Sequence, residues 1–247
     1  MPLTTTGAGS GSGGFTPASL SNLVASLIVA QARSAGNLWQ DTAQTIPAIA
    51  SNDPVRVAVD SYSGVTWTAP SDAARPLLGT DGSGHWWLIS NGTSTGLGAP
   101  NSSGLVTGAA SLSFCADQTA AVNFSRCVQS LPGGGSTISL RNTTFYSIYI
   151  DNFQLYNPVP LVSNSSPHII TLSTPSSGPW SVWLDGGSLT VSNAVSGAFG
   201  QLQIGIYESV NGDPPWAGNF YGGIFAQSQW STQTQSQVEA YLGALHP

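Results

Sequence analysis

Apolar and polar residues alternate along many short segments of this chain. In residues 180–191, WSVWLDGGSLTV, Trp180, Val182 and Leu184 share one parity and Trp183 falls on the other. Successive side chains of a strand point to opposite faces of a sheet, and an Asp-Gly pair supplies the positive φ angles that a tight hairpin turn needs. The pattern predicts a β-hairpin that carries one tryptophan on each face.

Similar segments recur along the chain, with Gly, Pro, Asn and Ser between them. Further strands are expected at residues 55–59, 86–90, 110–116, 121–124, 137–141, 146–150, 153–156, 168–173, 202–207 and 220–227. Strands this frequent, separated by turn residues, are typical of an antiparallel sandwich.

Two segments show the spacing of an amphipathic helix instead. Thr16 and Pro17 suit a helix start, and a helix to about Ser34 is expected from Leu20, Leu23, Val24, Leu27 and Ile28. Ser231 can cap a C-terminal helix, whose apolar face would consist of Val238, Tyr241, Leu242 and Leu245. The predicted fold is all-β, a two-sheet antiparallel sandwich with a short C-terminal helix.

The first residues form a Gly/Ser-rich arm, MPLTTTGAGSGSGG. Gly9, Gly11 and Gly14 match G-x-G-x-x-G, but no predicted strand precedes them, so a linker is indicated rather than a dinucleotide site. We therefore expect an anchoring arm at 1–14, a connecting segment with a possible helix at 15–35, and the sandwich domain at 36–247.

The chain carries very little charge. Only 6% of its residues are charged, the basic ones are five arginines, and the net charge is −6. Nucleic acids bind to stripes of Lys and Arg, so no nucleic-acid partner is expected. No apolar run reaches the ~20 residues of a membrane helix, so no membrane partner is expected. A surface with so few charges favours a homo-oligomer in which part of it is covered.

Cys115 and Cys127 are the two cysteines. They could form a disulfide that stabilises the fold by roughly 3 kcal/mol, or they could be two small buried thiols. The spacing leaves both alternatives open.

Three segments together resemble the concanavalin A-like lectin/glucanase superfamily, in the LamG-like form found in phage and bacterial surface proteins. They are LWQDTAQTIPAIASNDPVRVAVDSYSG (38–64), DAARPLL (72–78) and FYGGIFAQSQWSTQTQSQVEAYLGAL (220–245). The resemblance implies a two-sheet jelly roll, a fold that serves lectins, glycosidases and structural modules alike. The family's first strand carries Trp and Asp, whereas SNLVASLIVAQARSAG (21–36) has neither, which favours the helix there.

Candidate catalytic groups are sparse. Glycoside hydrolysis uses two carboxylates that flank the bond, but Glu208 has no acidic neighbour and Glu239 belongs to the predicted C-terminal helix. No serine lies in a G-x-S-x-G turn, and Asn211, Asp213 and Asn219 offer a cation one carboxylate. The sequence therefore predicts no enzymatic activity, no metal and no cofactor.

Sugar binding relies on exposed aromatic faces and neutral polar groups. Trp86 and Trp87 are adjacent in a predicted strand and must face opposite ways, so one is a candidate for display. Trp216 follows two prolines in a predicted loop, and Asn219 lies near it. These four residues are the candidate ligand-binding residues. Trp67 and Trp180 are expected in the core, and Trp183 against the C-terminal helix or a neighbouring subunit.

Two functions fit these features. The first is a non-enzymatic bacteriophage virion protein of the fibre, tail or capsid surface, anchored to other virion proteins through residues 1–14 and able to contact host glycans. The alternative is a secreted or cell-surface carbohydrate-binding module.

Deleting residues 1–14 should leave the domain folded and prevent its incorporation into an assembly, because the arm has few apolar side chains to give a core. Ordering each of its residues costs about 1–2 kcal/mol of backbone entropy, which contacts with a partner would have to offset. The check compares the melting temperature of the truncated chain with its recovery in assembled particles. A much lower melting temperature with normal assembly would place the arm in the domain's own core.

Overall fold

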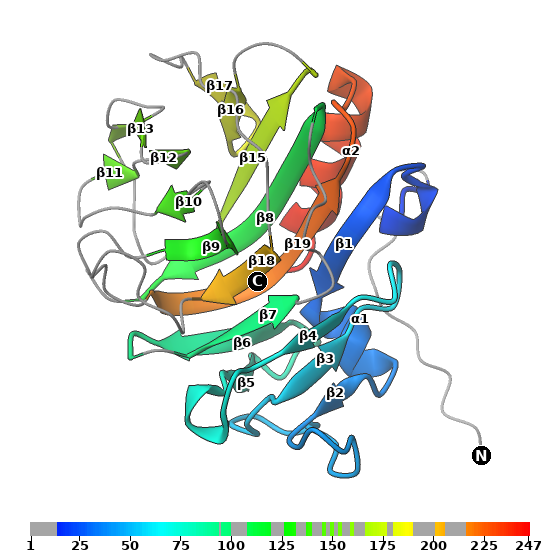
Figure 1. Ribbon diagram of the computed structural model, residues 1–247, viewed down its shortest axis with the longest axis vertical. Coiled ribbons are helices and arrows are strands. Elements are labelled where there is room, and N and C mark those ends of the chain that lie inside the picture. The colour runs from blue at the N-terminus through cyan, green and yellow to red at the C-terminus, as the bar shows by residue number, and fades with distance from the viewer. Residues whose placement is uncertain are drawn as a thin grey trace.

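Two antiparallel sheets face each other across an apolar core (Figure 1). The computed structural model describes residues 14–93, 95–99, 108–119, 126–131, 137–139, 145–146, 149–150, 153–154, 159–160, 166–176, 180–189, 201–205 and 216–247. The expected arm and the expected strand at 121–124 lie outside these ranges, except for Gly14. Each other expected strand overlaps an observed one, so the prediction of an all-β antiparallel sandwich is confirmed.

Sheet A has the described strand order β17 (Gly187–Leu189), β16 (Ser181–Leu184), β15 (His168–Thr174), β8 (Ala110–Gln118), β19 (Ala217–Ala226), β6 (Trp86–Asn91) and β5 (Leu77–Thr80). The strand β1 (Leu23–Ile28) also pairs with β19, beyond the end of β6. The long strand β19 therefore contacts β8 on one side and both β6 and β1 on the other.

Sheet B has the described order β10 (Thr137–Ser139), β9 (Arg126–Leu131), β18 (Gln201–Gly205), β7 (Gly96–Ala99), β4 (Thr66–Thr68), β3 (Val57–Val59) and β2 (Leu38–Trp39). Two short pairs stand apart from both sheets: β11 (Phe145–Tyr146) with β14 (Val159–Pro160), and β12 (Tyr149–Ile150) with β13 (Phe153–Gln154). The described helices are η1 (Pro17–Ser19), α1 (Val29–Ser34), η2 (Asp72–Ala74) and α2 (Thr232–Gly243). No helix among the described residues is long and apolar enough to cross a membrane.

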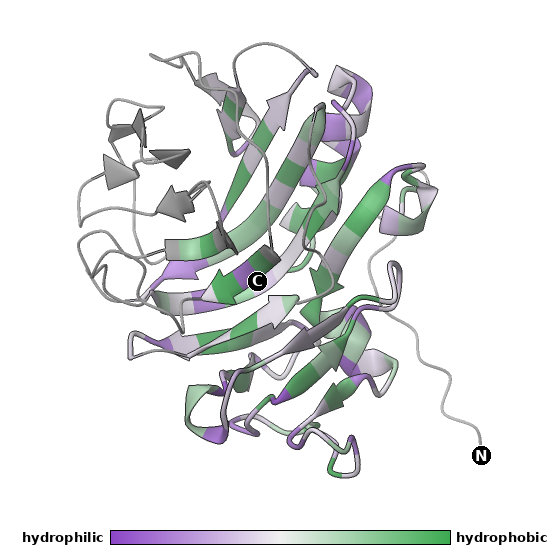
Figure 2. Cartoon of the chain, in the orientation of Figure 1, coloured by the Kyte–Doolittle hydropathy of each residue, from purple (hydrophilic) through white to green (hydrophobic). Residues whose placement is uncertain are grey.

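The core between the sheets is filled by every second residue of the strands. Hydrophobic and polar residues alternate along β8 and β15 in Figure 2. The largest fully buried side chains here include Trp67, Trp180, Trp216, Phe114 and Phe220. The expected core positions of Trp67 and Trp180 are thus confirmed.

A second apolar cluster covers part of the outer face of sheet A. The helix α2 packs against β8, β15 and β19, and Val238 and Leu242 contact a cluster that contains Ile224 and Cys115. Ser231 caps the helix, since its side chain accepts a hydrogen bond from the backbone N–H of Thr234 at 3.1 Å. The prediction of a capped C-terminal helix is confirmed.

The helix expected from Pro17 to about Ser34 is wrong over most of its length. Residues 23–28 form β1, which pairs with β19, and the helix α1 begins at Val29. Ala25 and Leu27 face the core, whereas Ile28 faces the α2 cluster. A strand buried on both faces is mostly apolar, and in β1 only Ser26 breaks the apolar run, so the pattern also satisfies helical spacing. The segment at 15–35 therefore contributes a strand to sheet A.

The hairpin predicted from residues 180–191 is confirmed within the described residues. Asp185 and Gly186 have φ angles of 49° and 79°, as a two-residue turn requires, and β16 pairs with β17. Trp183 of β16 pairs with Thr171 of β15, and both side chains lie on the outer face of sheet A, against which α2 packs. A contact of Trp183 with a neighbouring subunit stays a prediction.

The disulfide alternative for the two cysteines is wrong. Both thiols are free and buried. Cys115 belongs to the α2 cluster outside sheet A, whereas Cys127 lies in the core between the sheets. Burial raises the pKa of both thiols.

A buried carboxylate ties β1 to the β3–β4 turn. Asp60 is 2% exposed and accepts hydrogen bonds from the Ser26 hydroxyl at 2.5 Å and from the backbone N–H of Ser63 at 2.6 Å. Beside this turn, the Tyr62 hydroxyl lies 3.1 Å from that of Tyr241 in α2. The network joins three parts of the fold that are distant in sequence.

Replacing Ser26 with Ala should lower the free energy of unfolding by about 1–3 kcal/mol, because a buried carboxylate loses a donor. The matched control is Ser19→Ala, whose exposed hydroxyl bonds Thr16 O and whose loss should change stability by less than ~0.5 kcal/mol. Urea denaturation measures both. Equal effects of the two substitutions would contradict this account of Asp60.

Candidate functional site

The outer face of sheet A carries aromatic and polar side chains on the strands beside α2. The strand register places Leu77 opposite Ile89, Ile89 opposite Asn219, and Asn219 opposite Asp117. The inward positions of β5 and β6 are taken by Leu78 and Leu88, so the alternation turns this row outward. We use the name outer platform for Leu77, Trp87, Ile89, Asn219 and Tyr221, together with Asp117 beneath them.

Trp87 forms the aromatic part of the outer platform. Its half-buried indole has its ring centroid 5.5 Å from that of Tyr221, at an interplanar angle of 48°. A Cβ at Gly79 on the neighbouring strand would overlap the indole, so the glycine provides the space in which Trp87 lies. Leu77 is 38% exposed, and Ile89 is half-buried. The platform thus has an apolar end that solvent reaches.

A β-bulge in β19 positions Tyr221. The register of β19 on β8 shifts between Phe220 and Gly222, which makes Tyr221 the extra residue. Phe220 points into the core, whereas Tyr221 belongs to the outer cluster. Bulges re-aim side chains in this way, and here the phenol is directed toward Asp117.

Asp117 forms the buried polar end of the platform. The residue is only 3% exposed. Its carboxylate accepts hydrogen bonds from the Asn219 backbone N–H at 3.1 Å, from Asn219 Nδ2 at 3.0 Å and from the Tyr221 hydroxyl at 3.0 Å. Burial raises the pKa of the Asp117 carboxyl, and the hydrogen bonds from Asn219 and Tyr221 oppose that rise. Because Nδ2 of Asn219 is directed at Asp117, the amide oxygen Oδ1 is directed away from it.

Two histidines border this corner of the sheet. The His246 ring centroid lies 6.0 Å from that of Tyr221, and His168 Nδ1 lies 2.6 Å from Asp185 Oδ2 in the hairpin turn. Burial alone would raise the pKa of Asp185, but hydrogen bonds from His168 and the Ile169 backbone N–H outweigh it and lower that pKa. The pKa of Asp117 is therefore raised above the ordinary value of an aspartate, and the pKa of Asp185 is lowered below it.

The structure brings together two of the four candidate residues, Trp87 and Asn219. Trp86 faces the other way, as adjacent strand residues must, and packs on the core with the Arg33 guanidinium 4.8 Å from its ring centroid. Trp216 is 1% exposed, so its expected display in a loop is wrong. It directly precedes β19, and its indole packs in the core between the two sheets.

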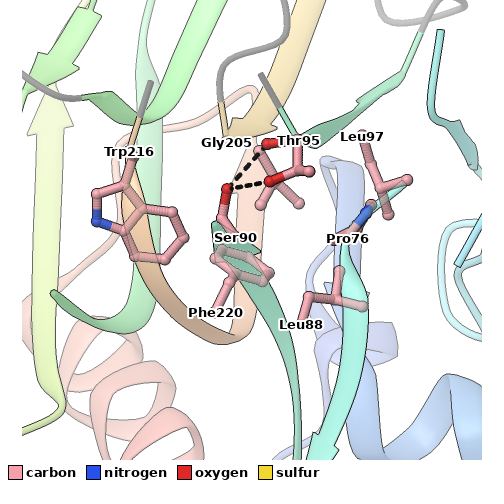
Figure 3. Close-up of a pocket in the computed structure, with 10 residues that line it drawn as sticks. Pro76, Leu88, Ser90, Thr95, Leu97, Gly205, Trp216 and Phe220 are labelled. Carbon is pink, nitrogen blue, oxygen red and sulfur yellow. Dashed lines mark hydrogen bonds between the residues drawn. The ribbon is translucent and has the colours of Figure 1, made fainter. Parts of the chain in front are cut away.

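A cavity beside Trp216 lies between the sheets and is too small for a sugar (Figure 3). Its lining includes Leu88 and Phe220 from sheet A and Leu97 and Gly205 from sheet B. The cavity volume open to the centre of a water molecule is about 10 Å³, which is room for about one water. The inner cavity is therefore not a saccharide site.

Asp117 and Tyr221 escaped the sequence reasoning. Asp117 lies two residues after Cys115 in a strand whose residues are all buried, and a buried carboxylate needs hydrogen-bonding partners. That rule indicates a polar cluster but does not name its members, since Asn219 is 102 residues away. Among the described residues, no three His, Cys, Asp or Glu side chains are grouped as metal ligands. Glu208, Asn211 and Asp213 lie outside the described residues.

No protein-family model and no curated protein matches the chain. Solved structures do share its fold. The sialidase of Trypanosoma rangeli in complex with sialic acid aligns with a TM-score of 0.57 and 12% identity, over 77% of this chain and 32% of the sialidase. The chain thus spans about a third of that enzyme's length.

A second similar structure is a complete domain. Domain 4 of AbnA, an extracellular family 43 arabinanase of Geobacillus stearothermophilus, in complex with arabinotriose, aligns with a TM-score of 0.56 and 14% identity, over 92% of this chain and 100% of the domain. A family 54 α-L-arabinofuranosidase aligns with a TM-score of 0.56 and 17% identity, over 78% of this chain and 52% of the enzyme. At these identities the likenesses establish the fold.

These comparisons correct the expectation of a non-enzymatic protein. That expectation rested on sparse carboxylates, whereas the chains that share the fold are parts of a sialidase, an arabinanase and an arabinofuranosidase.

Replacing Asp117 with Asn should change how stability depends on pH. Because the folded state raises the pKa of Asp117, wild-type stability relative to Asp117→Asn should be greatest near the ordinary pKa of about 4 and should fall as pH rises through the raised value. Urea denaturation between about pH 4 and pH 7 measures this difference.

Asp185→Asn is the matched control with the opposite sign. The folded state lowers the pKa of Asp185, so its contribution is present above the ordinary pKa of about 4 and is lost as pH falls through the lowered value. If wild type instead gains on Asp117→Asn as pH rises, the assignment of Asp117 as a carboxyl penalised by burial is wrong.

Proposed function

We propose that this chain is a carbohydrate-binding domain of a secreted or cell-surface protein, built on a concanavalin A-like jelly roll, and that it binds saccharides on the outer platform. The observation that carries the proposal is the half-buried indole of Trp87 beside the fixed amide of Asn219. One offers an aromatic face, and the other offers an oriented hydrogen-bonding group. Such a pairing of apolar surface with a few placed polar groups is typical of ligand sites.

The proposed binding mode follows from the two ends of the platform. The apolar face of a sugar ring stacks on Trp87 and extends toward Ile89 and Leu77, which bury its C–H groups. A hydroxyl of the same saccharide then donates to Asn219 Oδ1. Asp117 acts as a positioning residue, since its carboxylate holds the amide in the orientation that presents Oδ1.

The comparisons support this function over a purely structural one. The domain of AbnA that aligns over its whole length was solved with arabinotriose, and the aligned sialidase was solved with sialic acid. A role in a bacteriophage virion, with anchoring through residues 1–14, an extracellular location and homo-oligomers, stays a prediction. Residues 1–13 lie outside the described residues, and no comparison bears on a virion.

Replacing Trp87 with Ala should weaken binding of arabinotriose by roughly thirtyfold, the loss of ~2 kcal/mol expected for a central aromatic contact. Isothermal titration calorimetry on the full chain measures the affinity. The matched control is Trp39→Ala, which removes another half-buried tryptophan from β2 in sheet B and should leave the affinity unchanged. Thermal melts of both variants establish that they fold.

A second variant perturbs the platform without touching Trp87. In Gly79→Ala the new Cβ would displace the indole, and affinity should fall in parallel. Unchanged affinity in both folded variants, or equal losses in Trp39→Ala and Trp87→Ala, would exclude the outer platform as the site. Shortening of the trisaccharide during the titration, detected by chromatography, would add a catalytic activity to the binding one.

A further inference from the structure

We infer that the outer platform accepts an uncharged oligosaccharide and rejects sugars that carry a carboxylate. This inference rests on the proposed function and adds the ligand class. It follows from which hydrogen-bonding atom the platform presents, from the charges around it, and from the width of the row of side chains.

The polar atom that the platform presents is an acceptor. Asn219 Nδ2 donates to Asp117 at 3.0 Å, which turns Oδ1 toward the free side of the amide. The backbone N–H of Asn219 also donates to Asp117. An amide oxygen pairs with a donor, and a neutral sugar hydroxyl is one, whereas an ionised carboxylate has no proton to donate. A carboxylate at this position would face Asn219 Oδ1 as one acceptor against another.

The Asn219 amide cannot turn over to present Nδ2 instead of Oδ1. Rotating the amide by half a turn would place Oδ1 against the Asp117 carboxylate, which already accepts from the Tyr221 hydroxyl at 3.0 Å. Asn219 Oδ1 and the Asp117 carboxylate would then face each other as two acceptors. Asp117 is 3% exposed, and an unpaired polar atom is costly in such a buried position. Asp117 therefore fixes the preference for a donor.

Three arginine side chains that the structure describes are bound elsewhere. Arg33 donates to the backbone oxygen of Ile49 and lies over Trp86, which faces the core. Arg56 lies 3.6 Å from Asp72, and Arg75 donates to the backbone oxygen of Gln40. Recognition of a carboxylate in a partly buried site relies on a charge-assisted partner, most often an arginine fork.

The other ionisable groups described near the platform include two aspartates and two histidines. Asp117 lies beneath Asn219, and Asp185 is paired with His168 beyond β8. His246 contacts the ring of Tyr221. Over the whole chain the net charge is −6, so the long-range field also opposes an anionic ligand.

The row of side chains is wide enough for more than one sugar. Leu77, Ile89 and Asn219 lie on three neighbouring strands, and strands about 4.8 Å apart make such a row about 10 Å wide. Its apolar end is the more exposed one. An oligosaccharide that lies across β6 and β5 can therefore stack on the apolar end while one hydroxyl reaches Asn219.

The test uses two pairs of sugars in which only one member is charged. Trigalacturonate has carboxylates in place of the CH2OH groups of galactotriose, and sialyllactose is lactose with an added sialic acid. Affinities of the full chain are measured by calorimetry at about pH 7.5, where the carboxylates of both charged sugars are ionised. We expect at least one uncharged member to bind and its carboxylated counterpart to bind at least about tenfold more weakly, because a carboxylate beside Asn219 Oδ1 has no proton to donate and lies close to the Asp117 carboxyl group. Trp87→Ala should abolish the binding that is seen.

Two substitutions at one position sharpen the test. Ile89→Arg places a guanidinium beside Asn219. Ile89→Gln is the control, because it places a polar side chain without a charge at the same position. The arginine variant should improve binding of trigalacturonate by about tenfold relative to the glutamine variant, an advantage that added salt should reduce.

The outcomes separate the two proposals. Carboxylated sugars that bind as tightly as their neutral counterparts, through Trp87, would overturn this inference and leave the proposed function in place. If none of these sugars and no arabinotriose binds, or if binding survives Trp87→Ala in a folded protein, the proposed function fails and the inference fails with it.

Discussion

The pairing of β19 with its neighbours is the interaction on which the rest of the structure depends. This strand joins β8 on one side and both β6 and β1 on the other. Its residues alternate between the sandwich core, which receives Phe220 and Phe225, and the α2 cluster, which receives Tyr221 and Ile224. A strand buried on both faces has little freedom of register, because a shift by one residue would exchange the two sets. The site inherits that precision.

The bulge at Tyr221 is where this constraint becomes a site. An inserted residue lets Phe220 keep its place in the core while the phenol of Tyr221 reaches Asp117. The next residue is Gly222, where a Cβ would press on the side chains of Leu245 and Ile28. The outer platform is therefore held by regular strands and a fixed bulge, and rigid strands position ligand-binding groups better than loops do.

The local parts of this fold could be predicted from the sequence, and the long-range parts could not. Period-two patterning located most strands, Asp185-Gly186 gave the hairpin turn, and Ser231 gave the helix start. Residues 23–28 were misassigned because this strand is covered on both faces and Ser26 alone interrupts its apolar run. Trp216 was misplaced because two preceding prolines suggested a loop, whereas the core takes up its indole. The opposite facing of Trp86 and Trp87 followed from strand geometry alone, but which of them faces outward did not.

The platform itself was beyond reach of the sequence because it depends on contacts between distant segments. Asp117 and Asn219 are separated by 102 residues and meet only through the register of β8 and β19. Burial of that carboxylate carries an energetic cost, which the donors from Asn219 and Tyr221 offset in part. A fold selected for stability alone could place an apolar residue at position 117, as it does at Cys115 two residues earlier. Keeping a carboxylate there restricts the orientation of a half-buried amide, and this restriction has value where the amide must present one atom to a ligand.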